Sequence, residues 1–199
     1  MKIIDISQEV FSCRVFPGDP APERQVMLRI PDGAVCNLTA FRMCAHNGTH
    51  VDAPHHFLED GRTIDKMDLN RFIGSAYVTA HEGEISAGDA REILSKARAA
   101  DSEAAKRILV KGAAVVTEEA AAVFAEAGIL LFGNESQTVG PEDAPMKVHL
   151  TMLGAEIVLL EGIRLADAEE GVWFLNAAPL NLGGADGAPC RAVLMDLKK

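Results

Sequence analysis

The chain concentrates metal-binding side chains in one short stretch, HNGTHVDAPHH, which spans residues 46–56. This stretch holds four of the six histidines of the protein, together with an aspartate. Imidazole nitrogens and carboxylate oxygens are the ligands that zinc, manganese and ferrous iron accept in proteins. His46, His50 and Asp52 therefore form a candidate coordination shell. A solvated polar loop is the alternative interpretation, but such a loop would not require this density or spacing.

The spacing of these ligands requires the backbone to bend. In a straight strand, His46 and His50 would lie about 13 Å apart at ~3.3 Å per residue, too far for one ion. Gly48 lies midway and tolerates backbone angles that other residues avoid, and Pro54 interrupts regular hydrogen bonding. The β-branched residues and the proline also disfavour a helix. We therefore predict a strand over about residues 37–45 that runs into a kinked loop.

Strand-like and helical segments alternate on both sides of this stretch, a pattern that predicts an α/β fold. Short apolar runs predict strands over residues 3–6, 26–30, 38–45, 75–80, 106–111, 129–132, 157–160 and 192–197. Capping residues indicate three helices. They are residues 89–99 after Ser86, residues 118–127 between Thr117 and Gly128, and residues 146–153 before Gly154.

Length and composition indicate one domain, residues 1–199, because 48% hydrophobic residues can bury a single core. No apolar run approaches the ~20 residues that span a bilayer, and residues 1–10 lack the apolar core of a secretory signal. We therefore expect a cytoplasmic protein with no membrane partner. The net charge of −10 disfavours nucleic acid as a partner and leaves small molecules. The four cysteines show no C-x-x-C spacing and are expected to be reduced, buried thiols.

The stretch also resembles a family signature. Its pattern H-x-G-T-H-x-D-A-P-x-H is similar to that of the cyclase/kynurenine formamidase-like family of metal-dependent hydrolases, which includes isatin hydrolases. Weaker similarity extends along the chain, at DIS (5–7), FPGD (16–19), GRTID (61–65), His149, LLEG (159–162), AAPL (177–180) and GAPCRAVL (187–194). The resemblance implies a swivelling β/β/α-type domain with a mixed sheet flanked by helices.

The same resemblance implies a role for each site residue and a cofactor of one or two divalent cations, Zn²⁺ or Mn²⁺, per chain. The implied metal ligands are His46, His50, Asp52, His149 and Glu161. His56 is the implied general acid/base, whereas His55 occupies a variable position and inherits no role. Without the resemblance, His149 would be interpreted as a packed helical residue and Glu161 as the exit of a strand to solvent.

Two departures from the family pattern affect the expected substrate. Phe16 stands where formamidase-like members have Trp, and GNESQ (residues 133–137) stands where they have a segment resembling G-I-D-x-x-S. Both segments lie where the family recognises its substrate, so the reaction class transfers better than the substrate. Phe16 is the candidate to contact a planar or cyclic substrate, although a phenylalanine in such a segment is more often part of the core. The family also frequently forms homodimers or larger homo-oligomers, which implies the same for this chain.

These observations favour a hydrolase that cleaves the C–N bond of a small formamide or cyclic amide, or the C–O bond of a lactone, with metal-activated water. Two alternatives remain open. His50, Asp52 and His149 also satisfy the pattern of two histidines and one carboxylate in non-haem iron oxygenases, although that pattern leaves His46 and His56 unexplained. A metal-binding protein without catalysis is the second alternative, and it would need no His56.

Overall fold

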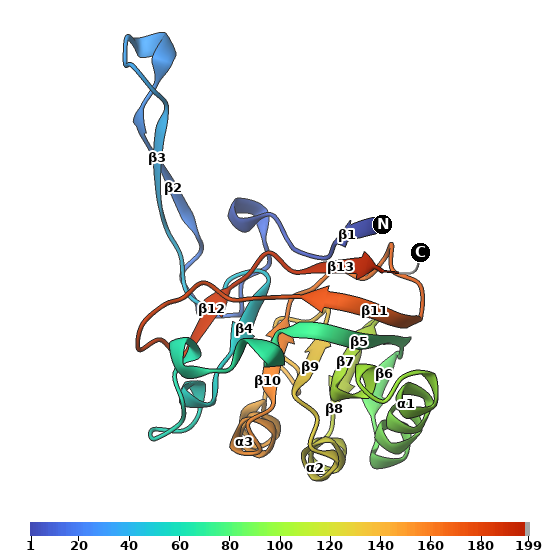
Figure 1. The fold of residues 1–199 in the computed structure, drawn as a ribbon. Coiled ribbons are helices and arrows are strands. Elements are labelled where there is room, and N and C mark those ends of the chain that lie inside the picture. Colours follow the sequence, from blue (N-terminus) through green and yellow to red (C-terminus); the bar gives the residue numbers. More distant parts are fainter. Residues whose placement is uncertain (198–199) are drawn as a thin grey trace.

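A mixed, curled sheet forms the centre of the structure (Figure 1). The computed structural model describes residues 1–197. In sheet order, the nine strands are β1 (Lys2–Asp5), β13 (Val193–Asp196), β11 (Gly171–Asn176), β5 (Ile73–Ala80), β7 (Arg107–Lys111), β9 (Leu131–Asn134), β10 (Val158–Glu161), β4 (His50–Asp52) and β12 (Gly187–Pro189). The strands β5, β7, β9 and β10 are parallel. Antiparallel strands flank them on both sides.

Three helices cover one face of the parallel strands (Figure 1). They are α1 (Ala87–Ala100), α2 (Glu118–Ala127) and α3 (Met146–Gly154). Ser86 begins α1 with a capping box that it forms with Asp89, and Thr117 caps α2. Gly128 ends α2 in the left-handed conformation, with φ of 65°. The predicted α/β class, with a mixed sheet flanked by helices, is confirmed.

Each face of the sheet packs against its own hydrophobic core. In β7, Ile108 faces the core beneath the helices, whereas Leu109 faces the core on the other side of the sheet. Leu159 and Leu160 of β10 divide between the two cores in the same way. A strand that is buried on both faces carries a continuous apolar run, which is why these strands could be predicted from the sequence. The packed sheet therefore fixes the position of Glu161, the polar residue at the end of β10.

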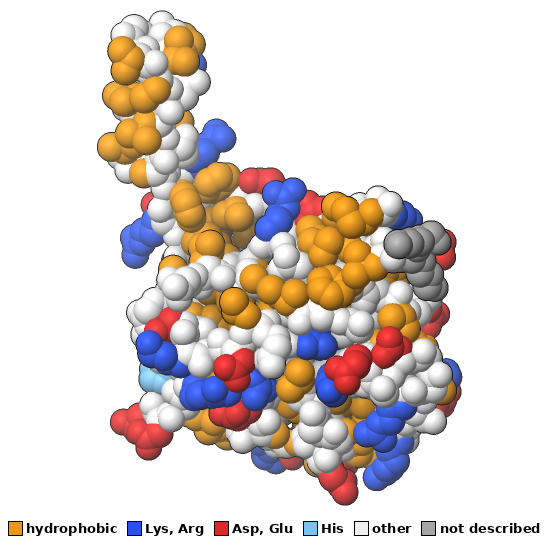
Figure 2. Space-filling view, viewed as in Figure 1, with side chains coloured by type: hydrophobic (Ala, Val, Ile, Leu, Met, Phe, Trp, Pro, Cys, Tyr) orange, Lys and Arg blue, Asp and Glu red, His pale blue; other side chains and the backbone are white. Residues whose placement is uncertain are grey.

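A long β-hairpin projects from the body (Figure 1). It is formed by β2 (Glu23–Leu28) and β3 (Leu38–Arg42), and every residue of both strands is exposed. We call residues 23–42 the arm. Figure 2 shows apolar side chains gathered along it. Its exposed large hydrophobic residues are Val26, Met27, Leu28, Ile30, Val35, Leu38 and Phe41.

The structure corrects several details of the sequence analysis. The strand predicted to reach residue 45 ends at Arg42, because the chain leaves the arm and turns there. The strands β4, β11 and β12 were missed, as was the small parallel pair β6 (Gly83–Ile85) and β8 (Ala114–Val116). The cysteines are free, but none is fully buried as predicted: Cys13, Cys44 and Cys190 are half-buried, and Cys36 at the tip of the arm is exposed. No helix within residues 1–197 is both long and apolar enough to cross a membrane.

Candidate metal centre

A tight turn brings the first histidine of the stretch back toward the second. Asn47 closes this turn, because its backbone N–H donates to the Cys44 carbonyl and its side chain accepts from the Cys44 N–H. Gly48 follows with φ of 66°, and a Cβ atom there would lie 2.9 Å from Cys13 Cβ. Glycine therefore satisfies both the backbone angle and the close approach. The bend that the ligand spacing required is present.

The next part of the stretch is a strand rather than the predicted kinked loop. His50–Asp52 forms β4, which pairs with β10 on one side and with β12 on the other. This pairing places His50 directly opposite Glu161. Because side chains two residues apart in a strand project to the same face, His50 and Asp52 point the same way. Sheet pairing thus unites ligands that lie far apart in the sequence.

Three predicted ligands form the first cluster. His46 Nδ1 lies 2.8 Å from Asp52 Oδ1, and His50 Nε2 lies 3.3 Å from the same oxygen. One ligand atom from each of His46, His50 and Asp52 falls within 4.8 Å of the others. The side chains of His50 and Asp52 are fully buried. The structure therefore brings together the three residues that the sequence had grouped.

Asp52 also belongs to a second cluster, with His149 of α3 and Glu161 of β10. His149 Nε2 lies 3.3 Å from Glu161 Oε1 and 3.7 Å from Asp52 Oδ2. Glu161 Oε2 lies 3.4 Å from His50 Nε2, which links the second cluster to the first. The two oxygens of Asp52 thus face two different sets of ligands. This is the arrangement expected of a carboxylate shared by two ions.

The hydrogen bonds around these clusters fit a cation. Asp52 Oδ2 is buried and has no hydrogen-bond partner. His50 Nδ1 lies 3.1 Å from the Gly48 carbonyl and His149 Nδ1 lies 2.9 Å from the Pro145 carbonyl, so both Nδ1 atoms donate a proton. In the neutral imidazoles, the lone pairs on Nε2 then face carboxylate oxygens. A cation between them would turn this repulsion into coordination, as backbone carbonyls commonly orient metal-binding histidines.

The carboxylates of the site also attract protons. Burial lowers the pKa of His46, but its hydrogen bonds with Asp186 and Asp52 outweigh burial and raise that pKa to about 11. Burial also lowers the pKa of His50, but its hydrogen bonds with Asp52 and Glu161 outweigh burial and raise that pKa to about 9. Burial raises the pKa of Asp52, but the two histidines hold it well below the ordinary value. A cation must therefore displace protons to bind here.

The predicted acid/base, His56, lies beside the first cluster. It ends a short 3-10 helix, Pro54–His56, and its ring stacks on that of His46 at 4.0 Å between centroids. Its side chain is 28% exposed, unlike those of the buried ligands. His56 Nδ1 lies 3.4 Å from Asp186 Oδ2, and the same oxygen lies 2.8 Å from His46 Nε2. Sequence reasoning missed Asp186, which lies in a glycine-rich loop 140 residues beyond His46.

Gln137, in the segment that departs from the family pattern, supports the site together with Val139, which follows that segment, and Thr49 of the motif. Gln137 Nε2 donates to the Gly48 carbonyl at 3.0 Å, and the Val139 N–H donates to Glu161 Oε1 at 2.8 Å. Thr49 Oγ1 donates to the Gly162 carbonyl at 2.7 Å. These bonds hold the turn at Gly48 and the carboxylate of Glu161 in place.

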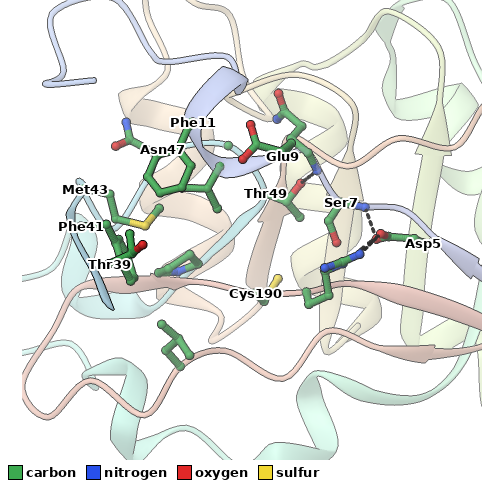
Figure 3. Close-up of a pocket in the computed structure, with 16 residues that line it drawn as sticks. Asp5, Ser7, Glu9, Phe11, Thr39, Phe41, Met43, Asn47, Thr49 and Cys190 are labelled. Carbon is green, nitrogen blue, oxygen red and sulfur yellow. Dashed lines mark hydrogen bonds and ion pairs between the residues drawn. The ribbon is translucent and has the colours of Figure 1, made fainter. Parts of the chain in front are cut away.

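A cavity of about 680 Å³ is lined by residues of the N-terminal segment, the arm and the motif (Figure 3). Its lining includes Phe11, Phe41 and Asn47, which Figure 3 labels, and none of the six predicted metal or acid/base residues. The rings of Phe11 and Phe41 meet edge to face with centroids 6.3 Å apart. Phe16, the predicted substrate contact, is half-buried and is not among the residues that line this cavity.

Comparison with known proteins places the chain in a family. Residues 4–141 match the model of the Cyclase family, described as "putative cyclase". The chain is 32% identical to a kynurenine formamidase of Salinibacter ruber and 33% identical to one of Delftia acidovorans, with 98% of each chain covered in both cases. These matches confirm the resemblance that the sequence had suggested.

Solved structures give the same result. A potential metal-dependent hydrolase with cyclase activity superposes with a TM-score of 0.83 at 26% identity, over 100% of this chain and 99% of the other. Isatin hydrolase A from Labrenzia aggregata has a TM-score of 0.82 at 19% identity, over 99% and 94% of the two chains, a likeness of fold alone. Fold and site together define a metal-dependent hydrolase of the α/β class. The chain belongs to the Cyclase family.

Proposed function

We propose that the protein hydrolyses the C–N bond of a small formamide or cyclic amide at a centre of one or two divalent cations. The observation that carries this proposal is Asp52, whose two oxygens face two buried clusters and whose Oδ2 has no hydrogen-bond partner. Relatives named kynurenine formamidase support the bond type. The aryl formamides are therefore the first substrate class to test, with lactones as the corresponding C–O substrates.

The proposed ligands are His46, His50, Asp52, His149 and Glu161. Imidazole and carboxylate donors suit Zn²⁺ and Mn²⁺, and cellular supply decides between such metals. When bound, a divalent cation polarises a carbonyl group and lowers the pKa of water toward 7. The chain contributes a dry setting for this chemistry, because the side chains of Asp52, His50 and Glu161 are at most 3% exposed.

His56 is proposed to move the proton. Its ring lies next to the ligand His46, yet it is partly open to solvent and outside both clusters that contain Asp52. In amide hydrolysis, the attacking water loses a proton and the leaving nitrogen gains one. A histidine suits both transfers because its ordinary pKa is near neutral pH. His56 would take the proton from water and return it to the departing amine.

The geometry favours hydrolysis over the oxygenase alternative. That alternative needs His50, Asp52 and His149 around one ion, but the structure places His50 and His149 in different clusters on opposite oxygens of Asp52. It would also leave His46 and Glu161 without a role. The named relatives and neighbours are formamidases and hydrolases.

Turnover assays test the proposal. Purified protein loaded with Zn²⁺ or Mn²⁺ should hydrolyse members of a panel of aryl formamides, cyclic imides and lactones. A chelator should abolish this activity, and added metal should restore it, because the cation would activate both the substrate carbonyl and the water. Metal binding with no turnover across the panel would favour a non-catalytic metal-binding protein. Metal-dependent consumption of oxygen would favour the oxygenase.

We further propose that the protein is a homodimer in which the arm packs on a second copy. An isolated two-stranded hairpin is marginal in water, and the arm exposes seven large hydrophobic residues. The arm carries three arginines and two acidic residues, whereas the whole chain has a net charge of −10. The arm is therefore slightly basic and would meet an acidic surface on the second copy.

Light scattering after size exclusion should therefore give twice the monomer mass. Val26→Asp in the arm should shift the protein to a monomer, because it puts a charge on the surface proposed to be buried. Leu69→Asp, at an exposed position outside the arm, is the matched control and should stay dimeric. A monomeric wild type would contradict this proposal.

A further inference from the structure

We propose that Asp186 is a positioning residue that sets the proton-bearing nitrogen of both His46 and His56. The inference rests on the proposed function, since it assigns His46 to the metal and His56 to proton transfer. Asp186 Oδ2 lies 2.8 Å from His46 Nε2 and, more loosely, 3.4 Å from His56 Nδ1. One carboxylate oxygen thus faces two stacked imidazole rings, whose planes differ by 24°.

An ionised carboxylate only accepts hydrogen bonds, so a nitrogen that bonds to it directly, with no cation between, must carry a proton. The Asp186 side chain is 43% exposed, and an aspartate open to solvent is ionised near neutral pH because its ordinary pKa is about 3.9. The oxygen has lone pairs enough to accept from both rings. When a cation takes the position between His46 Nδ1 and Asp52, the remaining proton of His46 is on Nε2, and the nearby negative charge of Asp186 favours Nδ1 as the proton-bearing nitrogen of His56.

For His46, this arrangement directs Nδ1 toward the metal. With Nε2 donating to Asp186, the free lone pair is on Nδ1, the atom 2.8 Å from Asp52 Oδ1. His50 and His149 do the reverse, because their Nδ1 atoms donate to backbone carbonyls and leave Nε2 for the ion. Asp186 thus does for His46 what the Gly48 carbonyl does for His50.

For His56, the same carboxylate leaves Nε2 as the basic atom. A carboxylate that accepts from the far nitrogen of a catalytic histidine both selects its tautomer and stabilises the imidazolium that forms when the base takes a proton. The stacking of the two rings keeps them at one oxygen. Asp186 would therefore couple the ligand to the acid/base through a single side chain.

The backbone around Asp186 is anchored, which fixes the side chain. The Ala53 N–H donates to the Asp186 carbonyl at 2.9 Å, and the Ile64 N–H donates to the Ala185 carbonyl at 2.9 Å. A Cβ atom at Gly187 would lie 2.7 Å from His46 Cε1, so glycine at this position lets the ring pack against the loop. The loop therefore meets His46 beside Asp52, the residue that pairs with Gly187 between β4 and β12.

The test is Asp186→Asn, which preserves size but offers one acceptor oxygen and one amide donor group. The neutral amide oxygen is a weaker acceptor than the carboxylate it replaces, and it carries no charge to stabilise an imidazolium. Because the Asp186 side chain is 43% exposed, the variant should fold. We expect zinc affinity to fall roughly 10- to 100-fold, the usual effect of losing a carboxylate behind a metal-binding histidine. ¹⁵N NMR of the zinc-loaded protein should show that His46 or His56 no longer holds its proton where the wild type does.

Asp65→Asn is the matched control, because Asp65 Oδ1 accepts from the Gly184 N–H in the same loop but contacts neither histidine. It should keep wild-type zinc affinity and tautomers. Unchanged affinity and tautomers in Asp186→Asn would overturn the proposal. Loss of a whole ion from that variant, with both tautomers retained, would instead make Asp186 a metal ligand and also overturn it. Absence of amide turnover in the wild type would refute the proposed function alone, since the affinity and NMR measurements need no substrate.

Discussion

Asp52→Ala will retain almost no divalent cation after dialysis, whereas Glu161→Ala will retain about one ion per chain, because each lost ligand belongs to a different number of clusters. Asp52 Oδ1 faces His46 and His50, and Asp52 Oδ2 faces His149. Glu161 belongs to one cluster, with His149 and Asp52. Removal of the shared carboxylate should therefore empty both positions. Loss of a direct ligand should weaken binding by more than the roughly 10- to 100-fold caused by losing an outer hydrogen-bond partner.

Metal analysis of protein purified with excess zinc gives the measurement, and circular dichroism shows whether each variant is folded. His55→Ala is the matched control, because His55 lies in the same stretch but belongs to neither cluster. It should bind as much zinc as the wild type. If the wild type binds one ion and Glu161→Ala binds the same amount, the centre is mononuclear and rests on His46, His50 and Asp52. Wild-type zinc content in Asp52→Ala would contradict the ligand assignment itself.

Local spacing predicted the part of the site that is local. His46, His50 and Asp52 fall within seven residues, and the bend at Gly48 followed from the reach of the chain. The second cluster needed the resemblance, because nothing near His149 or Glu161 distinguishes a ligand from a packed histidine or a strand end. Asp186 had no local signal at all. It approaches His46 only because β12, which follows it, pairs with β4.

The fold shows the same division between local and tertiary signals. Helices with capping residues and strands buried on both faces could be predicted, because capping residues and continuous apolar runs are visible in the local sequence. The strands β4 and β12 contain three residues each and exist through pairing, so no periodicity could reveal them. The strand β11 is different. Its run VWFL has the β-branched and aromatic residues typical of a strand, so β11 was predictable from the sequence although it was not among the predicted strands.

His56→Ala should keep its full metal content and lose roughly 10²- to 10⁴-fold in kcat, the usual effect of removing a general acid/base. Two features of the structure separate His56 from the ligands. It lies outside both clusters that share Asp52, and its partly exposed ring is placed to exchange protons with solvent and substrate. Its stacking on His46 brings it close to the proposed metal position, and His56 also forms a potential metal-binding group with His46 and Asp186, so the zinc content of the variant decides between the two roles.

Parallel measurement of zinc content and of kcat on the best substrate distinguishes the two roles. His50→Ala should lose metal and turnover together, because His50 is fully buried between Asp52 and Glu161. His56→Ala should lose turnover alone, and His55→Ala, the adjacent residue on the same 3-10 turn, should lose neither. Equal loss of zinc from the His50 and His56 variants would show that His56 helps to hold the ion. Proton transfer would then have to come from another group.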